Sequence, residues 1–188
     1  MKRYLAAFAV MGALATPARA ADSYTTDPDF TAPTFEVTHL GFTTQHGRFN
    51  KSSGKAMIDF AARKGSVDFT VYTESLDMGS GAWTKHLFDE GLFNVRKYPT
   101  MTFKSDKLIF DGNKVVAAEG QFTMIGVTRP LKVSVNGFQC GSHPANKKAM
   151  CAGDVTATIR RSDFGLTKYI PAVSDEVQIS VPVEAYKN

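Results

Sequence analysis

Histidine is the side chain best suited to metal binding or to proton transfer near neutral pH, and this sequence contains four. A zinc site draws its ligands from closely spaced positions, such as HxH or HxxxH. His39 and His46 are seven residues apart across a glycine, and His86 and His143 stand far from both. The pattern therefore predicts no metal site. His86 has two interpretations: it caps an interior pocket or satisfies a buried carbonyl group, or it donates a hydrogen bond to a ligand headgroup.

The motifs of common enzyme classes are missing from the sequence. It contains no GxSxG nucleophile elbow, no P-loop, no GxGxxG and no HExxH. Asp89 and Glu90 are adjacent, but neighbouring side chains on a helix point about 100° apart and do not make an acid/base pair. We therefore expect a protein that is not an enzyme and that needs no cofactor. The alternative is an enzyme that uses His86 and a nearby carboxylate as acid and base.

The two cysteines, Cys140 and Cys151, are separated by ten residues that include Gly, Pro and Asn. This composition is typical of a hairpin tip. In an oxidising compartment the default for such a pair is a disulfide, and closing this loop should stabilise the fold by roughly 3 kcal/mol. A metal or redox pair is the alternative, and the long gap containing only His143 disfavours it.

The first twenty residues have the features of a secretory signal peptide. Lys2 and Arg3 precede an apolar run that is too short to span a membrane, and an A-x-A cleavage site ends at Ala20. We expect cleavage after Ala20, export to the periplasm and a mature domain of residues 21–188. This mature chain carries 19 basic and 18 acidic residues. Its net charge therefore disfavours nucleic acid or an anionic membrane as a partner.

Alternation of apolar and polar residues, the pattern of half-buried strands, dominates the mature chain. It recurs in about eight or nine segments at hairpin spacing, with a strong turn signal at Asp111-Gly112-Asn113. The regular succession of strand, helix and strand that builds parallel sheets is missing. We therefore predict a mainly all-β fold of one domain, either an antiparallel barrel or a sandwich.

Residues 82–103 interrupt this alternation. Ser80 can cap the start of a helix and Gly91 can end it. Three side chains recur at helical spacing and would face the interior: Trp83, His86 and Leu87. We predict one short helix that covers part of one end of the sheet structure.

The alternation along the predicted strands places eleven side chains on the face that points to the interior of the sheet structure. They are Phe35, Val37, Ile58, Phe60, Phe69, Val71, Phe103, Phe122, Met124, Val133 and Ile159. These residues could form an ordinary packed core or the wall of a pocket, and their phase leaves both alternatives open. Eight closed strands leave an interior just able to hold side chains or one elongated ligand.

Short motifs follow one another along nearly the whole mature chain. They are HLG at 39–41, GRF at 47–49, HL at 86–87, FNV at 93–95, KYPTMTFKS at 97–105, GQFTMIGVTRP at 120–130, RSDFG at 161–165 and DEV at 175–177. In these residues and in this order the chain resembles the YceI-like family. The resemblance extends from Tyr24 to about Ala185.

This resemblance implies a lipocalin-like antiparallel β-barrel of about eight strands around an elongated apolar pocket. It implies a polyisoprenoid, an isoprenoid quinone or a similar long-chain amphiphile as the ligand, a location in the periplasm, and a possible homodimer. The eleven interior residues, together with Trp83, His86 and Leu87, are then the expected ligand-binding residues. A carrier or reservoir is the favoured function. An enzyme acting on such a lipid, or a stress-induced structural protein with a filled barrel, are the alternatives.

Three arginines, Arg48, Arg129 and Arg161, belong to the motifs that carry the resemblance. A guanidinium group is planar and always charged, so it could pair with a phosphate or quinone oxygen of a ligand. The alternative is a structural ion pair at one end of the barrel with an acidic residue of the RSDFG or DEV motif. The sequence favours this structural interpretation.

Overall fold

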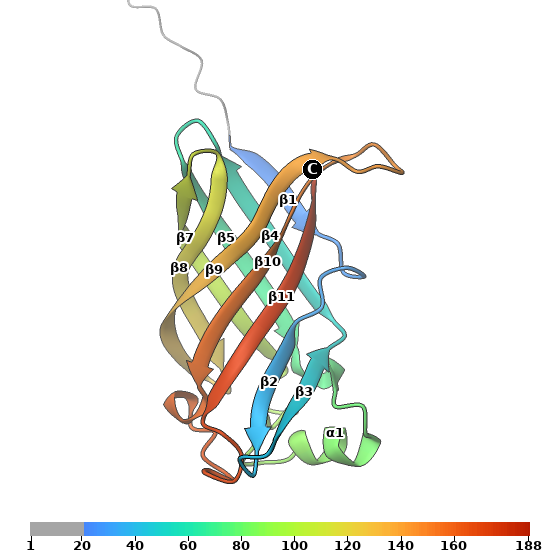
Figure 1. Ribbon diagram of the computed structural model, residues 1–188, viewed down its shortest axis with the longest axis vertical. Helices are drawn as coiled ribbons and strands as arrows, with labels where there is room; N and C mark the ends of the chain where they lie inside the picture. The colour runs from blue at the N-terminus through green and yellow to red at the C-terminus, as the bar shows by residue number, and fades with distance from the viewer. Residues whose placement is uncertain (1–20) are drawn as a thin grey trace, which may run out of the picture.

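The computed structural model describes residues 21–188, and the expected signal peptide with its cleavage site lies outside them. Eight antiparallel strands close into a barrel in the order β1-β4-β5-β7-β8-β9-β10-β11, and β11 pairs back with β1 (Figure 1). Their bounds are Asp22–Thr26 for β1, Ser52–Asp59 for β4, Lys64–Tyr72 for β5, Thr100–Asp111 for β7, Lys114–Met124 for β8, Val127–Ser142 for β9, Ala149–Arg160 for β10 and Glu176–Lys187 for β11. The predicted antiparallel barrel is confirmed, and the alternative sandwich is not formed.

Three further strands extend the sheet beyond this ring: β2 (Thr34–His39), β3 (Thr43–Phe49) and β6 (Leu76–Asp77). They can attach because β11 changes its partner along its length. Residues 185–187 of β11 pair with β1, whereas residues 178–180 pair with β2. The long strand β11 therefore both closes the barrel and anchors β2 beside its opposite end.

Two prolines lie inside long strands, at positions where one side of the strand has no paired neighbour. Pro182 stands between the part of β11 that pairs with β1 and the part that pairs with β2. Pro130 pairs with Gln121 of β8, while β10 joins β9 only from Ser134 onward. A proline lacks the N–H that a neighbouring strand would require, so both positions tolerate it.

The α-helix α1 comprises Gly81–Leu87 and lies at the barrel end where β2 and β3 meet (Figure 1). Ser80 occupies the N-cap position as predicted, but its side chain makes no capping hydrogen bond. The prediction that Gly91 ends the helix was wrong, because the helix ends at Leu87 and Gly91 lies in the turns that follow. Within residues 21–188 no helix combines the length and hydropathy needed to cross a bilayer.

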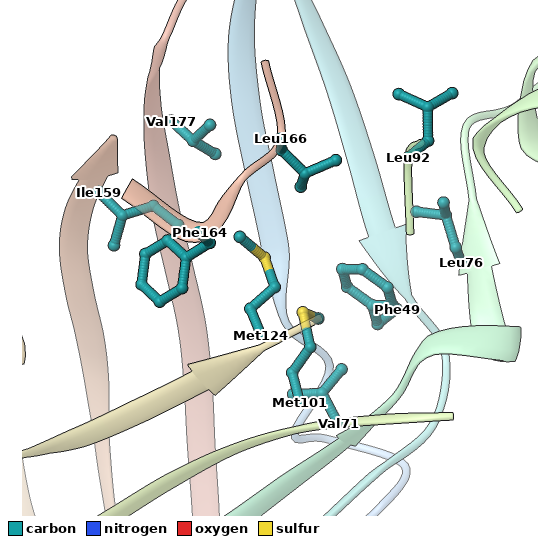
Figure 2. Close-up of a cluster of buried hydrophobic side chains, with 10 residues drawn as sticks. All are labelled: Phe49, Val71, Leu76, Leu92, Met101, Met124, Ile159, Phe164, Leu166 and Val177. Carbon is teal, nitrogen blue, oxygen red and sulfur yellow. The ribbon is translucent and has the colours of Figure 1, made fainter. Parts of the chain in front are cut away.

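Two clusters of apolar side chains pack along the barrel, one toward each end. The cluster near α1 is drawn in Figure 2 and combines residues from the strands with residues from the loops. Phe49, Met101 and Met124 come from strands, whereas Leu92 and Phe164 come from the segments that connect them. This packing holds the connecting segments against the barrel, so they have defined positions although they lack regular structure.

The segment between β10 and β11 begins with a short 3-10 helix, η2 (Arg161–Phe164), and is anchored by the carboxylate of Asp175. Asp175 accepts hydrogen bonds from the Ser162 backbone N–H at 2.8 Å, the Ser162 hydroxyl at 2.7 Å and Arg160 Nε at 3.2 Å. The two bonds from Ser162, followed by the contact with Arg160, lower the pKa of Asp175 below its usual value. The ionised carboxylate therefore fixes both ends of this segment.

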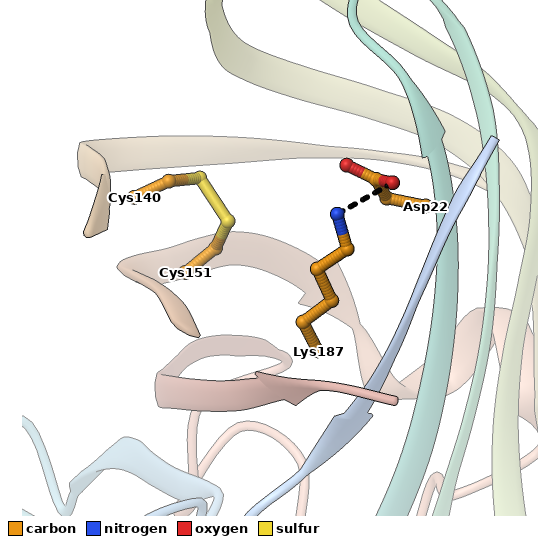
Figure 3. The surroundings of a disulfide bond; sticks show 4 residues. All are labelled: Asp22, Cys140, Cys151 and Lys187. Carbon is orange, nitrogen blue, oxygen red and sulfur yellow. Dashed lines mark ion pairs between the residues drawn. A yellow bond between two sulfur atoms is a disulfide. The ribbon is translucent and has the colours of Figure 1, made fainter. Parts of the chain in front are cut away.

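A disulfide joins Cys140 of β9 to Cys151 of β10, as predicted (Figure 3). The two residues lie directly opposite each other in the antiparallel pair. Beyond them the hairpin projects past the end of the barrel (Figure 1). Nearby, Lys187 Nζ lies 2.7 Å from Asp22 Oδ1, across the pair of strands that closes the ring.

We predict that replacing both cysteines by serine lowers the free energy of unfolding by roughly 3 kcal/mol, because the loop of the unfolded chain is no longer closed. Urea unfolding of residues 21–188 under oxidising conditions measures this difference. Wild-type protein treated with a reductant should approach the stability of the double variant. Equal stability of the oxidised protein and the variant would contradict the prediction.

We also predict that Asp175→Asn destabilises the fold at pH 7 by about 1 kcal/mol, because a charged acceptor of hydrogen bonds is lost. The lowered pKa of Asp175 makes its contribution present above the unfolded value near pH 4, and this contribution is lost as the pH falls further. The difference between variant and wild type should therefore shrink at pH 3. Asp163→Asn, at an exposed position of η2, is the matched control and should have little effect at either pH.

Candidate functional site

The barrel encloses a cavity of about 580 Å³ whose wall is formed mainly by apolar side chains. Phe35, Phe69 and Phe122 line it and are only partly buried, although all three belong to strands and point inward. Part of each ring faces the open interior rather than other side chains. Of the two alternatives that strand phase left open, the structure therefore has the pocket wall and not the completely packed core.

Thirteen of the fourteen residues that were expected to bind a ligand line this cavity. They are Phe35, Val37, Ile58, Phe69, Val71, Trp83, His86, Leu87, Phe103, Phe122, Met124, Val133 and Ile159. The strand residues reach the cavity because alternate side chains of a strand point to the same face of the sheet. Contact between these side chains and a ligand stays a prediction.

Phe60 is the one residue of the expected set that does not line the cavity. It follows Asp59, the last residue of β4, and its ring centroid lies 6.5 Å from that of Phe110 and 6.4 Å from that of Phe138. Alternation sets the direction of a side chain only within a strand, so the phase of β4 does not extend to Phe60. These three rings instead pack at the barrel end remote from α1.

The mouth of the cavity is identified by residues that line the cavity and are also exposed to solvent. Six residues meet both conditions: Lys55 belongs to β4, and the other five lie together at one end of the barrel, namely Trp83, His86, Lys168, Tyr169 and Ala172. Of these five, the first two belong to α1, and the other three belong to the segment between β10 and β11. The cavity therefore opens between the helix and this segment, and its opposite end is closed by apolar packing.

Two contacts join the elements around the mouth. His86 Nε2 and the Tyr169 hydroxyl are 3.0 Å apart, which links α1 to the segment between β10 and β11. The rings of His39 and Trp83 have centroids 6.3 Å apart, which brings α1 close to the end of β2. Trp83, His86 and Leu87 thus meet the cavity as predicted, but Trp83 remains 45% exposed because it forms the rim rather than an inner wall.

The histidines do not assemble into a metal site. His46 lies 3.3 Å from Glu36 on the outside of β2 and β3, and His143 accepts hydrogen bonds from backbone amides of its own hairpin. In residues 21–188 no group of three or more His, Cys, Asp or Glu side chains could hold a metal ion. His86 does not satisfy a buried carbonyl group, because its partners are the Tyr169 hydroxyl and, at 3.6 Å, Asp89 Oδ2.

Arg161 is a buried cation in the cavity wall, and its guanidinium group is occupied by backbone carbonyl groups. Nε donates to Ser174 at 2.8 Å, Nη1 to Leu166 at 2.7 Å and to Lys168 at 2.8 Å, and Nη2 to Val173 at 2.9 Å. Burial lowers the pKa of Arg161, and the nearby carboxylate of Asp175 opposes this shift. The side chain shapes the rim of the mouth by holding the segment between β10 and β11.

The predicted structural ion pair of Arg161 with an acidic residue was therefore wrong in its detail. Asp175 pairs with Arg160 instead, at 3.2 Å. Arg129, the second motif arginine, donates from Nε to the backbone carbonyl of Asp163 at 3.1 Å. Both arginines bind peptide oxygens of this one connecting segment, so the structural interpretation holds although the acceptors are carbonyls.

Sequence patterns missed wall residues that come from irregular segments. Leu92 and Phe93 follow α1, and Leu166, Lys168 and Tyr169 lie between β10 and β11. These segments have no regular periodicity, so phase cannot assign their side chains to the inside or the outside. The only available signal was that FNV and RSDFG, two of the motifs that carry the resemblance, lie in or next to them.

Comparison with known proteins agrees with the motifs. The family model described as the YceI-like domain matches residues 24–185. A UPF0312 protein of Shewanella putrefaciens is 31% identical over 190 residues, which cover 99% of this chain and 98% of that relative.

Solved structures show the same fold. The crystal structure of BcnA from Burkholderia cenocepacia has a TM-score of 0.73 at 24% identity and covers 85% of this chain and 98% of its own. A polyisoprenoid binding domain from Saccharophagus degradans has a TM-score of 0.63 at 15% identity, with coverage of 88% and 98%. These likenesses show the barrel fold. The family model and the Shewanella relative confirm the resemblance, and the chain belongs to the YceI-like family.

Proposed function

We propose that this protein binds one long-chain isoprenoid, isoprenoid quinone or similar amphiphilic lipid in its barrel and serves as a carrier or reservoir. The observation that carries the proposal is the apolar cavity of about 580 Å³, most of whose exposed lining residues gather beside α1. Cavities that hold small organic ligands have volumes of about 300–1,000 Å³, and an eight-stranded barrel has room for one such ligand. Each CH₂ group buried there would contribute about 0.8 kcal/mol to binding.

The distribution of polar groups along the cavity favours an amphiphile that binds with its headgroup at the mouth. Among the described residues, no Asp or Glu belongs to the cavity wall. His86, Lys168 and Tyr169 stand at the mouth and can all donate hydrogen bonds. A headgroup rich in oxygen acceptors, such as a phosphate or a quinone, would meet these donors while its apolar chain extends toward Phe103 and Val133.

Similarity to a known lipid-binding domain supports the barrel architecture that the proposal requires. The polyisoprenoid binding domain of Saccharophagus degradans shares the barrel architecture, although at 15% identity this likeness concerns the fold alone. The disulfide suits an oxidising compartment and agrees with the periplasmic location that the first twenty residues predict.

The two alternative functions have less support. An enzyme would need His86 and a carboxylate positioned at a bound substrate, yet Asp89 lies 3.6 Å from His86 on the outer side and is exposed. A structural protein with a filled barrel does not match the open interior. Binding without chemical change of the ligand is the function that the geometry supports best.

A filled cavity should abolish binding. We predict that Ala157→Trp, which places an indole in the cavity from β10, reduces uptake of a fluorescent long-chain lipid at least tenfold, because the ring occupies the space of several CH₂ groups. Thr158→Trp is the matched control, since Thr158 is the next residue of β10 and is exposed. Titration of each folded variant with the lipid, and displacement by an isoprenoid alcohol, measures the affinity.

The proposal requires that wild type and Thr158→Trp bind alike and that Ala157→Trp binds at least tenfold more weakly. Circular dichroism and urea unfolding establish that the variants are folded. Equal affinity of all three proteins would place the lipid elsewhere and overturn the proposal. A second variant at the wall, Phe122→Ala, should weaken binding more than it lowers stability, since part of its ring faces the cavity.

A further inference from the structure

Most of the large apolar side chains that this protein exposes gather around the mouth of the cavity. Seven such side chains are exposed in residues 21–188, and five of them lie at this end of the barrel. They are Leu40, Phe42, Trp83, Tyr169 and Ile170. Phe42 is 89% exposed and Leu40 56% exposed, which is unusual for two apolar residues so close together in a turn.

Contacts place the three segments that carry these side chains next to one another. Leu40 N–H donates to the carbonyl of Ala172 at 2.6 Å, which joins the turn between β2 and β3 to the segment between β10 and β11. The ring contacts of Trp83 with His39 and of His86 with Tyr169 place α1 beside both of these segments. Residues 38–46, 81–88 and 166–173 thus form one surface around the opening, here named the mouth face (Figure 1).

The cationic side chains of the mouth face are Lys85 and Lys168, and its three segments contain no Asp or Glu. Asp89, Glu90 and Glu36 border the face, and Asp89 and Glu36 are each close to one of its histidines, His86 and His46 respectively. The near-neutral net charge of the mature chain, which disfavoured an anionic membrane, therefore conceals a local apolar surface that carries two lysines inside a border of carboxylates.

We propose that the mouth face docks on the surface of an anionic phospholipid bilayer, an inference that rests on the proposed lipid-binding function. Phe42, Leu40 and Ile170 would enter the boundary between headgroups and acyl chains, where exposed apolar side chains gain the most. Trp83 and Tyr169 have the amphipathic rings that favour the membrane interface. Lys85 and Lys168 would meet the lipid phosphates.

Docking in this orientation solves a physical difficulty of a lipid carrier. The cavity opens within the mouth face, so a docked protein would present its opening directly to the bilayer. An isoprenoid chain could then enter the barrel without passing through water, where each exposed CH₂ is unfavourable. Two lysines and a few apolar residues give only weak and reversible attachment, which suits a protein that must leave with its ligand.

The test uses residues 21–188, which include every element of the described fold and exclude the apolar N-terminal run that would bind vesicles by itself. The probes are vesicles of phosphatidylglycerol mixed with phosphatidylethanolamine, and vesicles of phosphatidylcholine alone. Trp83 is the single tryptophan of the chain, so its fluorescence reports on this face. We expect a blue shift and co-sedimentation with the anionic vesicles, and much weaker binding to phosphatidylcholine.

Phe42→Ser should weaken binding to anionic vesicles about tenfold or more, because the most exposed apolar side chain of the face is lost. Phe30→Ser is the matched control: Phe30 is 59% exposed, but it lies in the connection between β1 and β2, outside the mouth face. It should bind as wild type does. Phe42 does not line the cavity, so uptake of a soluble fluorescent fatty acid should be unchanged in both variants.

The other outcomes separate a failure of docking from a failure of the proposed lipid-binding function. If wild type takes up the fatty acid but ignores vesicles, docking is wrong and the lipid-binding function stands. If Phe30→Ser loses vesicle binding as strongly as Phe42→Ser, the mouth face is not the docking surface. If Phe42→Ser instead dissociates a dimer seen by sedimentation and vesicles are not bound, the face meets a second copy of the chain. Vesicle binding through Phe42 without any uptake of a lipid chain would uphold docking and remove the proposed function.

Discussion

The pairing of β11 with β1 is the interaction on which the rest of the structure depends. These two strands are the last and the first of the described chain, and three residue pairs between Tyr24–Thr26 and Ala185–Lys187 close the ring. A closed ring of eight strands has a nearly fixed diameter, because strand number and tilt determine it together. The diameter leaves more space than the inward side chains of this sequence fill. The cavity therefore depends on closure of the ring together with the sizes of all the inward side chains, and not on any single residue.

Closure also makes the two ends of the barrel different. At one end short hairpin turns and the rings of Phe60, Phe110 and Phe138 pack together. At the other end β11 pairs with β2 instead of β1. This end also carries α1 and the segment between β10 and β11, which hydrogen bonds of Arg161 and Asp175 hold in place. The buried guanidinium group of Arg161 binds four carbonyl groups and so holds the rim of the mouth in place without regular secondary structure. The same end carries the exposed apolar and basic residues.

Much of this arrangement could be predicted from the sequence, because alternation is a local property. Alternation gives the strands and the inward phase of residues such as Phe69 and Met124, and the Asp111-Gly112-Asn113 signal gives the turn between β7 and β8. The sequence pattern assigned Phe60 to the cavity wall wrongly, because Phe60 lies one residue beyond the end of β4. The acceptors of Arg161 lie 5 to 13 residues away along an irregular segment, so no periodic pattern pointed to them. The open interior and the charge of one face depend on pairings between distant residues, which neither composition nor net charge describes.

The central claim is that the hollow interior holds one long apolar chain. The most direct measurement is solvent extraction and mass spectrometry of the protein purified without detergent from the cell envelope of its native host. The account predicts one dominant long-chain isoprenoid or similar amphiphile, close to one molecule per protein chain, and its loss from protein whose cavity is blocked. Protein that carries no lipid, and that takes up none from an added isoprenoid alcohol, quinone or fatty acid, would contradict it.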